Sequence, residues 1–150
     1  MRKLFSISLM TLLMVACQSN RQGRLGNDSG DPLKNVSVEV SHIGGPAIKF
    51  DTIYFDLGSL AIDGPNQTRD FIFANTGDTP LVIEKVEASC SCLDIDYPKD
   101  SIASGMKSKI TMTLKMNEVS SGQFYRSANV YTNASDEPTE IILQGIKSYE

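Results

Sequence analysis

The sequence predicts an all-β fold, namely an antiparallel sandwich of seven to eight short strands. From residue 36 onward, apolar and polar residues alternate in short runs, which is the period of a strand with one buried face. Turn-forming residues separate these runs at spacings of roughly 8–20 residues, as in sandwiches and barrels. No segment beyond residue 36 has a convincing helical period. These observations favour two packed antiparallel sheets.

Seven runs are expected to form strands, and a shorter run would be the eighth. Residues 36–40 alternate valine with polar residues, and 48–57 is rich in β-branched and aromatic residues before a glycine. Turn-forming residues at 75–78, 120–122 and 133–138 separate later runs. The seven expected strands are 36–40, 48–57, 70–74, 81–86, 106–116, 122–132 and 139–146, and 93–97 is the eighth.

Two of these runs predict which side chains form the core. Phe71 and Phe73 share one face of their strand, and Ile72 points the other way. The clearest alternation lies in 106–116, where four apolar residues oppose lysines and threonines. The apolar set is Ile110, Met112, Leu114 and Met116, and the polar set is Lys109, Thr111, Thr113 and Lys115.

The sandwich is expected to be Ig-like but without the inter-sheet disulfide of antibody domains. The chain has no tryptophan, and Cys90 and Cys92 are too close in sequence to join two sheets. A small closed barrel is the alternative architecture, since it shows the same alternation. The folded domain is expected to span 36–150.

The N-terminus predicts a signal peptide over residues 1–16. Arg2 and Lys3 precede an uncharged stretch, 4–16, which is shorter than the about 20 residues that span a bilayer. Residues 14–17, Met-Val-Ala-Cys, resemble the lipobox of bacterial lipoproteins, although Met14 stands where leucine is usual. That resemblance implies cleavage before Cys17 and lipid on its sulfur and amino group. An ordinary cleaved signal that contains a cysteine is the alternative.

Residues 17–35 are expected to form a flexible tether. Residues 18–32 are rich in Gly, Ser, Asn and Asp, and Leu25 is their single large apolar residue. Such a segment cannot bury enough surface to offset its ordering entropy. No acidic run follows Cys17, which favours a periplasm-facing location in the cell envelope. The lipid would be the membrane contact, and two or more acyl chains anchor stably.

Charge and motifs exclude several functions. The net charge is −4, and losing Arg2 and Lys3 makes it −4 − 2 = −6, which disfavours nucleic-acid binding. The chain has one histidine and no nucleophile motif, phosphate loop or dinucleotide fingerprint. We therefore expect no enzyme and no cofactor. The sequence carries no signal for oligomeric state.

Cys90-Ser91-Cys92 is the one candidate site. In an extended segment the two Cα atoms would lie ~6.5–7 Å apart, at or beyond the ~6.8 Å limit for a disulfide, so closure requires a bend. An exported chain would meet an oxidising compartment. Three interpretations remain open, namely a static staple, a pair of buried thiols, and a redox or metal function.

Other metal-ligand residues are too dispersed to predict a site. His42 lies far from the cysteines in sequence, and Met112 and Met116 are better explained as core residues than as copper ligands alongside Met106. Asp94 and Asp96 share a strand face beside the cysteines. This pair could bind a cation or serve acid–base chemistry, but a solvated edge strand is the simpler explanation.

One family pattern covers nearly the whole folded part. The residues that carry it are 53–58 (IYFDLG), 71–78 (FIFANTGD), 80–81, 90–92, 104–105, Gly122, Val130, 132–133 and Gly145. Their order resembles a family of uncharacterised bacterial Ig-like domains with a Cys-Gly-Cys motif, although Ser91 replaces the glycine and Leu93 stands where threonine is common. The resemblance implies a secreted or lipid-anchored domain, similar in fold to the major sperm protein type, with no established activity.

The predicted function is therefore a non-catalytic module of the cell envelope. It would bind or scaffold another envelope protein through loops or an edge strand. The alternative is a thiol–disulfide or soft-metal (copper) protein that uses Cys90 and Cys92.

Overall fold

A computed structural model describes residues 37–41 and 44–149. The predicted signal peptide, the tether, Cys17 and His42 lie outside the described residues, so those predictions stay predictions. In the part that is described, no helix has the length and apolar character needed to cross a membrane.

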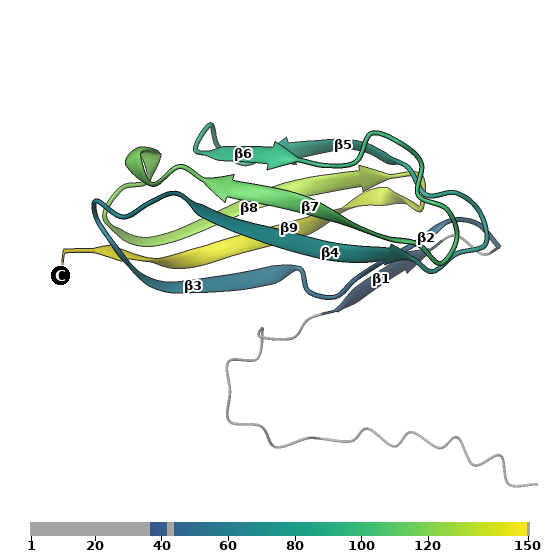
Figure 1. The fold of residues 1–150 in the computed structure, drawn as a ribbon, viewed down its shortest axis with the longest axis horizontal. Helices are drawn as coiled ribbons and strands as arrows, with labels where there is room; N and C mark the ends of the chain where they lie inside the picture. The colour runs from purple at the N-terminus through teal and green to yellow at the C-terminus, as the bar shows by residue number, and fades with distance from the viewer. Residues whose placement is uncertain (1–36, 42–43, 150) are drawn as a thin grey trace, which may run out of the picture.

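Two β-sheets stack face to face (Figure 1). The first sheet has the order β1-β2-β4-β7-β6, and its strands are β1 (Val38–Ser41), β2 (Ala47–Phe50), β4 (Gln67–Asn75), β7 (Lys107–Leu114) and β6 (Leu93–Asp96). The second has the order β3-β9-β8-β5, and its strands are β3 (Tyr54–Ala61), β9 (Ser135–Ser148), β8 (Gly122–Thr132) and β5 (Ile83–Ala88). The predicted all-β, Ig-like sandwich is confirmed, and the closed barrel is wrong.

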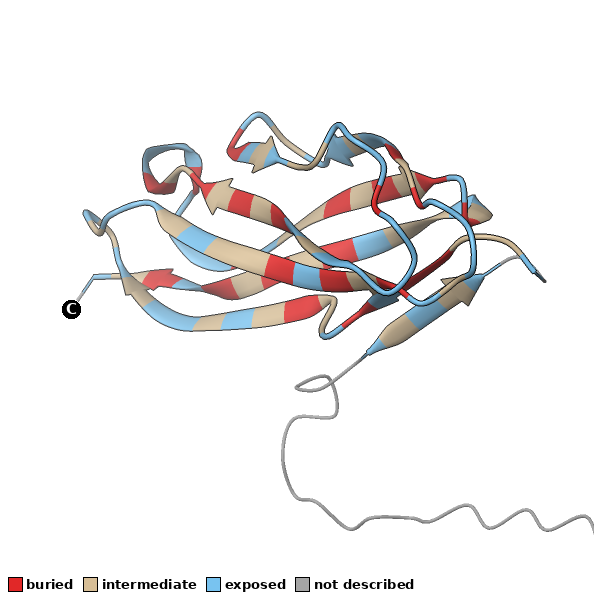
Figure 2. Cartoon of the chain, turned by 45° about the vertical axis from the view of Figure 1, so that its right-hand side comes forward, coloured by how far each residue is buried: buried red, intermediate tan, exposed pale blue. Residues whose placement is uncertain are grey.

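The core lies between the two sheets, and buried residues alternate with more exposed ones along the central strands (Figure 2). Phe71 and Phe73 are fully buried, whereas Ile72 between them is 42% exposed. The Phe55 ring of β3 meets Phe71 edge-on at 5.0 Å between centroids, which joins the two sheets. The predicted core set Ile110, Met112, Leu114 and Met116 is buried throughout, and this prediction is confirmed.

The expected single strand over 48–57 is wrong, because the chain changes sheets in its middle. The amide of Asp51 still donates to the Ile72 carbonyl of the first sheet, at 2.9 Å. Two residues later the Ile53 carbonyl accepts from the Ile142 amide of the second sheet, at 2.8 Å. Between them the Thr52 hydroxyl accepts from the Tyr54 amide and bends the backbone. This split is why the described residues contain nine strands.

Two further details differ from the predicted antiparallel pattern. β3 pairs with β9 in parallel, whereas the other strand pairs are antiparallel. β9 also begins at Ser135, earlier than the expected 139, because the turn is confined to Asn133 and Ala134. Pro138 is tolerated inside this strand because it lies where the β8–β9 register shifts.

A single turn of 3₁₀ helix, η1 (Met116–Glu118), follows β7 and rests on an unexpected buried lysine. Lys147 of β9 is 6% exposed, and its ammonium donates to the carbonyls of Met116 and Val119 at 2.6 and 2.7 Å. These hydrogen bonds satisfy the buried charge and fix η1 against the second sheet.

At the start of β7, three segments meet around one buried asparagine, and we call residues 44–47, 75–79 and 102–106 the Asn75 corner. The Asn75 amide nitrogen donates to the carbonyls of Thr79 and Ile102, at 2.8 and 2.9 Å. Its amide oxygen accepts from the backbone amides of Gly77 and Ala47, at 3.0 and 3.4 Å. The turn predicted at 75–78 is therefore also an internal junction.

Candidate functional site

The loop that carries Cys90 and Cys92 crosses from β5 in the second sheet to β6 in the first. At its entrance, Ser89 and Ser127 of β8 exchange two hydrogen bonds, one through the Ser89 hydroxyl. At its exit, the Lys115 amide donates to the Cys92 carbonyl at 2.9 Å. The loop is therefore anchored to both sheets, and we call residues 89–92 with their contacts at 115, 118 and 126 the disulfide corner.

Cys90 and Cys92 form a disulfide, with their Cα atoms 5.2 Å apart. This separation is shorter than that of an extended segment, because the chain turns here and the Leu93 amide reaches back to the Cys90 carbonyl. The two residues differ in exposure. Cys90 is half-buried between exposed serines, whereas Cys92 is 3% exposed and belongs to the core.

Arg126 of β8 places a cation directly against one sulfur. Its Nε atom donates to Cys92 Sγ at 3.2 Å, and one terminal nitrogen donates to the Tyr125 carbonyl at 2.7 Å. Sequence reasoning missed this residue. The signal was present, because Arg126 shares the inward face of its strand with Phe124, Ala128 and Val130. A charge on an apolar face is a reason to look for a buried partner.

The remaining charges of the corner pair with one another. The Lys115 ammonium lies 2.7 Å from the Asp94 carboxylate and donates to the Ser91 carbonyl at 3.3 Å. The hydrogen bond with Asp94, with a smaller contribution from Glu118, raises the pKa of Lys115. The Ser91 hydroxyl and the Glu118 carboxylate lie 3.4 Å apart. The loop is therefore held from outside by a lysine and from inside by an arginine.

The residues that were weighed as metal ligands and set aside do not come together in the part of the chain that the structure describes. Asp94 and Asp96 are both exposed, and Asp94 is paired with Lys115. Met112 and Met116 are core residues, and Met106 lies exposed at the opposite end of β7. Among the described residues, no three His, Cys, Asp or Glu side chains gather as a metal site would need.

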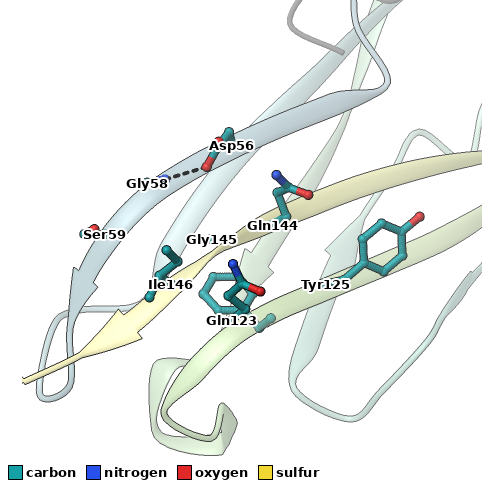
Figure 3. A pocket seen from close by; sticks show the side chains of 9 residues that line it. Asp56, Gly58, Ser59, Gln123, Tyr125, Gln144, Gly145 and Ile146 are labelled. Carbon is teal, nitrogen blue, oxygen red and sulfur yellow. Dashed lines mark hydrogen bonds between the residues drawn. The ribbon is translucent and has the colours of Figure 1, made fainter. Parts of the chain in front are cut away.

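A second feature is an open hollow of about 460 Å³ on the outer face of the second sheet (Figure 3). It lies over β3, β9 and β8, and its lining is Asp56, Gly58, Ser59, Gln123, Phe124, Tyr125, Gln144, Gly145 and Ile146. Asp56 is the one charged member of this lining. Tyr125 is 50% exposed and Ile146 is 41% exposed, so both offer apolar surface beside two glutamines. Partial burial and the nearby Glu140 carboxylate raise the pKa of Tyr125.

Two glycines shape this hollow. Gly58 has φ of +66° at the point where the β3–β9 register shifts, and its amide is capped by the Asp56 carboxylate at 2.8 Å. At Gly145, a Cβ would lie 2.8 Å from the Phe124 ring and 2.9 Å from the Gly58 carbonyl oxygen. A side chain at 145 would therefore collide with the bulge and with Phe124. Both glycines are part of the family pattern found in the sequence, but that pattern did not predict the hollow.

Solved structures share this fold at low sequence identity. A protein of unknown function from Porphyromonas gingivalis W83 aligns with a TM-score of 0.59 and 16% identity, over 68% of this chain and 47% of that one. A family 123 glycoside hydrolase from Clostridium perfringens aligns with a TM-score of 0.53 and 9% identity, over 66% and 23%. The ASH/PapD-like domain 7 of human CEP192 aligns with a TM-score of 0.52 and 10% identity, over 69% and 86%.

The chain thus spans about half the length of the Porphyromonas protein, and these likenesses are of fold alone. No curated protein matches the sequence. A family model does match, over residues 48–146, which is more than half of the 150 residues. The chain belongs to the family described as protein of unknown function, DUF1573.

Proposed function

We propose that the chain is a lipid-anchored lipoprotein of the cell envelope whose sandwich binds an extended segment of another envelope protein without catalysis. The observation that carries this proposal is the hollow on the outer face of the second sheet, with Tyr125 and Ile146 exposed at its rim. Exposed tyrosine beside a backbone-lined hollow is typical of a contact surface. The other parts of the proposal rest on residues 1–35.

The sequence predicts loops or an edge strand as the contact, but this face is a better contact surface than the sheet edges. β1 and β6 have four residues each, which leaves little edge to pair. β5 carries Glu84, Lys85 and Glu87, and β3 is interrupted by the bulge at Gly58. Short, charged or bulged edges are the devices by which proteins prevent strand addition. The face across β3, β9 and β8, which holds the hollow, is therefore the better candidate.

The lining of the hollow indicates the chemistry of the partner. Gln123 and Gln144 can each donate and accept hydrogen bonds, and Asp56 is already engaged with the Gly58 amide. A surface of amides, a phenol and one isoleucine suits a neutral polypeptide with polar and small apolar side chains. It offers no cluster of cations for phosphate groups. We therefore propose a neutral extended peptide segment as the occupant.

Anchor and tether would present this face to the envelope. Lipid on Cys17 would hold the chain at the membrane, and residues 17–35 would span on average about 25 Å as a coil. Intact mass of the chain purified from its own membranes, followed by peptide mapping, tests this part. A diacylated or triacylated peptide that begins at Cys17 is expected. A chain that keeps residues 1–16, or an unmodified Cys17, contradicts it.

Site-specific crosslinking tests the contact face. A photo-reactive phenylalanine analogue is placed at Tyr125 in the second sheet, or at Ile72 on the outer face of the first sheet as the matched control. Irradiation of intact cells is expected to give a discrete crosslinked envelope protein from position 125 and none from position 72. Equal crosslinking from both positions, or none from 125, contradicts the proposal. Tyr125→Asp should then abolish the same crosslink from a neighbouring position, Gln123.

A redox role is the second candidate, and one observation favours it. The disulfide has a cation in contact with its buried sulfur. A purely static staple has no need of a charge at that atom.

A further inference from the structure

We infer that the Cys90–Cys92 disulfide exchanges with external thiolates in one orientation, in which Cys90 is attacked and Cys92 leaves as a thiolate onto Arg126. This inference rests on the second candidate function, the redox role, which it deepens, and it does not depend on the proposed binding function. It makes the corner a place where a thiol of a partner or of a small molecule can be joined covalently to the chain.

Accessibility selects the sulfur that is attacked. Cys90 is half-buried, and its neighbours Ser89 and Ser91 are exposed, so an approaching thiolate can reach its side of the bond. Cys92 is 3% exposed and lies in the core cluster, so its sulfur is shielded by packed side chains. Exchange requires the attacking sulfur to approach along the line of the S–S bond, and only the Cys90 end is open to solvent.

Arg126 selects the sulfur that leaves. Its Nε–H already points at Cys92 Sγ at 3.2 Å, and this hydrogen bond becomes charge-assisted when the sulfur becomes a thiolate. No ion pair joins Arg126 to a carboxylate within residues 37–41 and 44–149, so its charge is free to stabilise an anion. A cation next to a thiol favours the thiolate, and a more stable thiolate leaves faster.

The step balances without a further reagent. An external thiolate attacks Cys90 Sγ, a new S–S bond forms between them, and the Cys90–Cys92 bond breaks. The electron pair of the broken bond passes to Cys92 Sγ, which keeps it as a thiolate beside Arg126. One thiolate is consumed and one is produced, so no proton is needed. The reverse attack by the Cys92 thiolate on the mixed disulfide releases the external thiolate and restores the ring.

Glutathione is the probe for the rate of this step. Full-length chains that carry Cys17→Ser, with the disulfide intact, are mixed with excess glutathione, quenched with acid at intervals and analysed by mass spectrometry. Arg126→Gln is expected to slow the loss of the intact disulfide about three- to tenfold, and Arg126→Lys should restore part of the rate. Circular dichroism confirms that each variant is folded.

Arg69→Gln is the matched control. Arg69 has the same intermediate exposure as Arg126 and donates to the carbonyl of the preceding residue, Thr68, as Arg126 does to Tyr125, but within the part of the chain that the structure describes it makes no hydrogen bond to a cysteine sulfur. Its rate should equal that of the parent. Equal slowing by the two substitutions would show a general effect of charge or stability. An unchanged rate in Arg126→Gln would show that the arginine does not assist the departure of the Cys92 thiolate. Either result overturns the inference.

The position of the adduct is a second readout that needs no change at Arg126. Peptide mapping of the quenched parent chain is expected to find glutathione on Cys90. An adduct on Cys92 reverses the proposed orientation and overturns it. The rate should also rise in proportion to glutathione concentration. A rate independent of glutathione, which signals reduction after unfolding only, overturns the inference as well.

Discussion

The two corners at opposite ends of β7 solve the same structural problem with different chemistry. At the start of the strand the backbone amide of Asn75 donates to the Met106 carbonyl, and at its end the backbone amide of Lys115 donates to the Cys92 carbonyl. Asn75 is fully buried and neutral, and all four of its side-chain hydrogen bonds go to backbone groups. The disulfide corner is half-exposed and carries two cations, Arg126 and Lys115, and the Glu118 carboxylate, and Lys115 also pairs with Asp94 next to the corner.

This difference separates a junction built for stability from one that can change its covalent state. A buried neutral amide that satisfies several backbone groups has no titration and no chemistry to offer, so its value lies in holding loops. A disulfide that closes a small ring restricts the unfolded chain only a little and so adds little stability. A disulfide with a purely structural role would not need the charges that surround this one. We therefore expect substitutions at the first corner to change mainly stability, and those at the second to change mainly reactivity.

Asn75→Ala should give the largest loss of stability of the substitutions considered. It removes four hydrogen bonds to backbone groups, of which those to the Ala47 amide and the Ile102 carbonyl are buried, so the free energy of unfolding should fall by about 2–4 kcal/mol. Asn133→Ala is the control, because Asn133 makes two backbone hydrogen bonds in an exposed loop and should cost less than about 1 kcal/mol. Urea unfolding measures both. Similar losses in the two variants would mean that the buried hydrogen bonds of Asn75 stabilise the fold no more than the exposed ones of Asn133.

Gly77→Ala should be the next most damaging change, because neighbouring backbone leaves no room for a side chain at position 77. A Cβ at 77 would lie 2.4 Å from both the Gly45 carbonyl oxygen and the Ala47 nitrogen, so backbone must move. The expected loss is about 1–3 kcal/mol, read from the urea midpoint. Gly105→Ala in the same corner meets nothing within 4 Å and carries only the strain of φ +75°, about 1 kcal/mol. If Gly105→Ala were the more harmful, the close packing at 77 would be unimportant.

Reducing the disulfide should lower the free energy of unfolding by less than the upper values expected for Asn75→Ala and Gly77→Ala. The closed ring holds only three residues, so chain entropy predicts about 1–2 kcal/mol between oxidised and reduced Cys17→Ser protein. Parallel urea titrations with and without reductant measure it. A loss above about 4 kcal/mol would make the disulfide a main support of the fold and would weaken the distinction between the corners.

The sequence predicted the buried face of β7 well, but it did not predict the contacts that form the corners at its two ends. Alternation in 106–116 placed the buried face of β7 correctly, because that strand is regular and both of its neighbours pair with it. The turn residues at 75–78 marked a loop, but the junction around Asn75 depends on segments about 30 residues apart on either side. Local pattern contains no information about such contacts.

The misses share this physical cause. The change of sheets at 51–53 was invisible, because β-branched and aromatic residues continue through it and only long-range pairing with Ile72 and Ile142 reveals it. The spacing of Cys90 and Cys92 did indicate that a bend was needed, because ring closure is a local constraint. Arg126, 34 residues from Cys92, could be suspected only as a charge on an inward face.

The smallest expected effect is a difference in pH dependence between the corners. In the folded chain the hydrogen bond with Asp94 raises the pKa of Lys115 above its ordinary 10.5. A raised folded pKa means that the stabilisation is fully present below 10.5 and is lost as the pH rises through the folded value. The gap in Tm between the parent and Lys115→Gln should therefore be small and constant from neutral pH to about 10, and should close above it.

The gap between the parent and Asn75→Ala should stay level over the same range, because an amide does not titrate. Tyr125 and Tyr131, whose pKa values are also raised, titrate alike in all three chains and cancel in each difference. Thermal unfolding followed by circular dichroism in steps from pH 7 to 11.5 measures both gaps. A level gap for Lys115→Gln would show that its pair with Asp94 is screened by solvent, so that Arg126 alone gives the disulfide corner its electrostatic character.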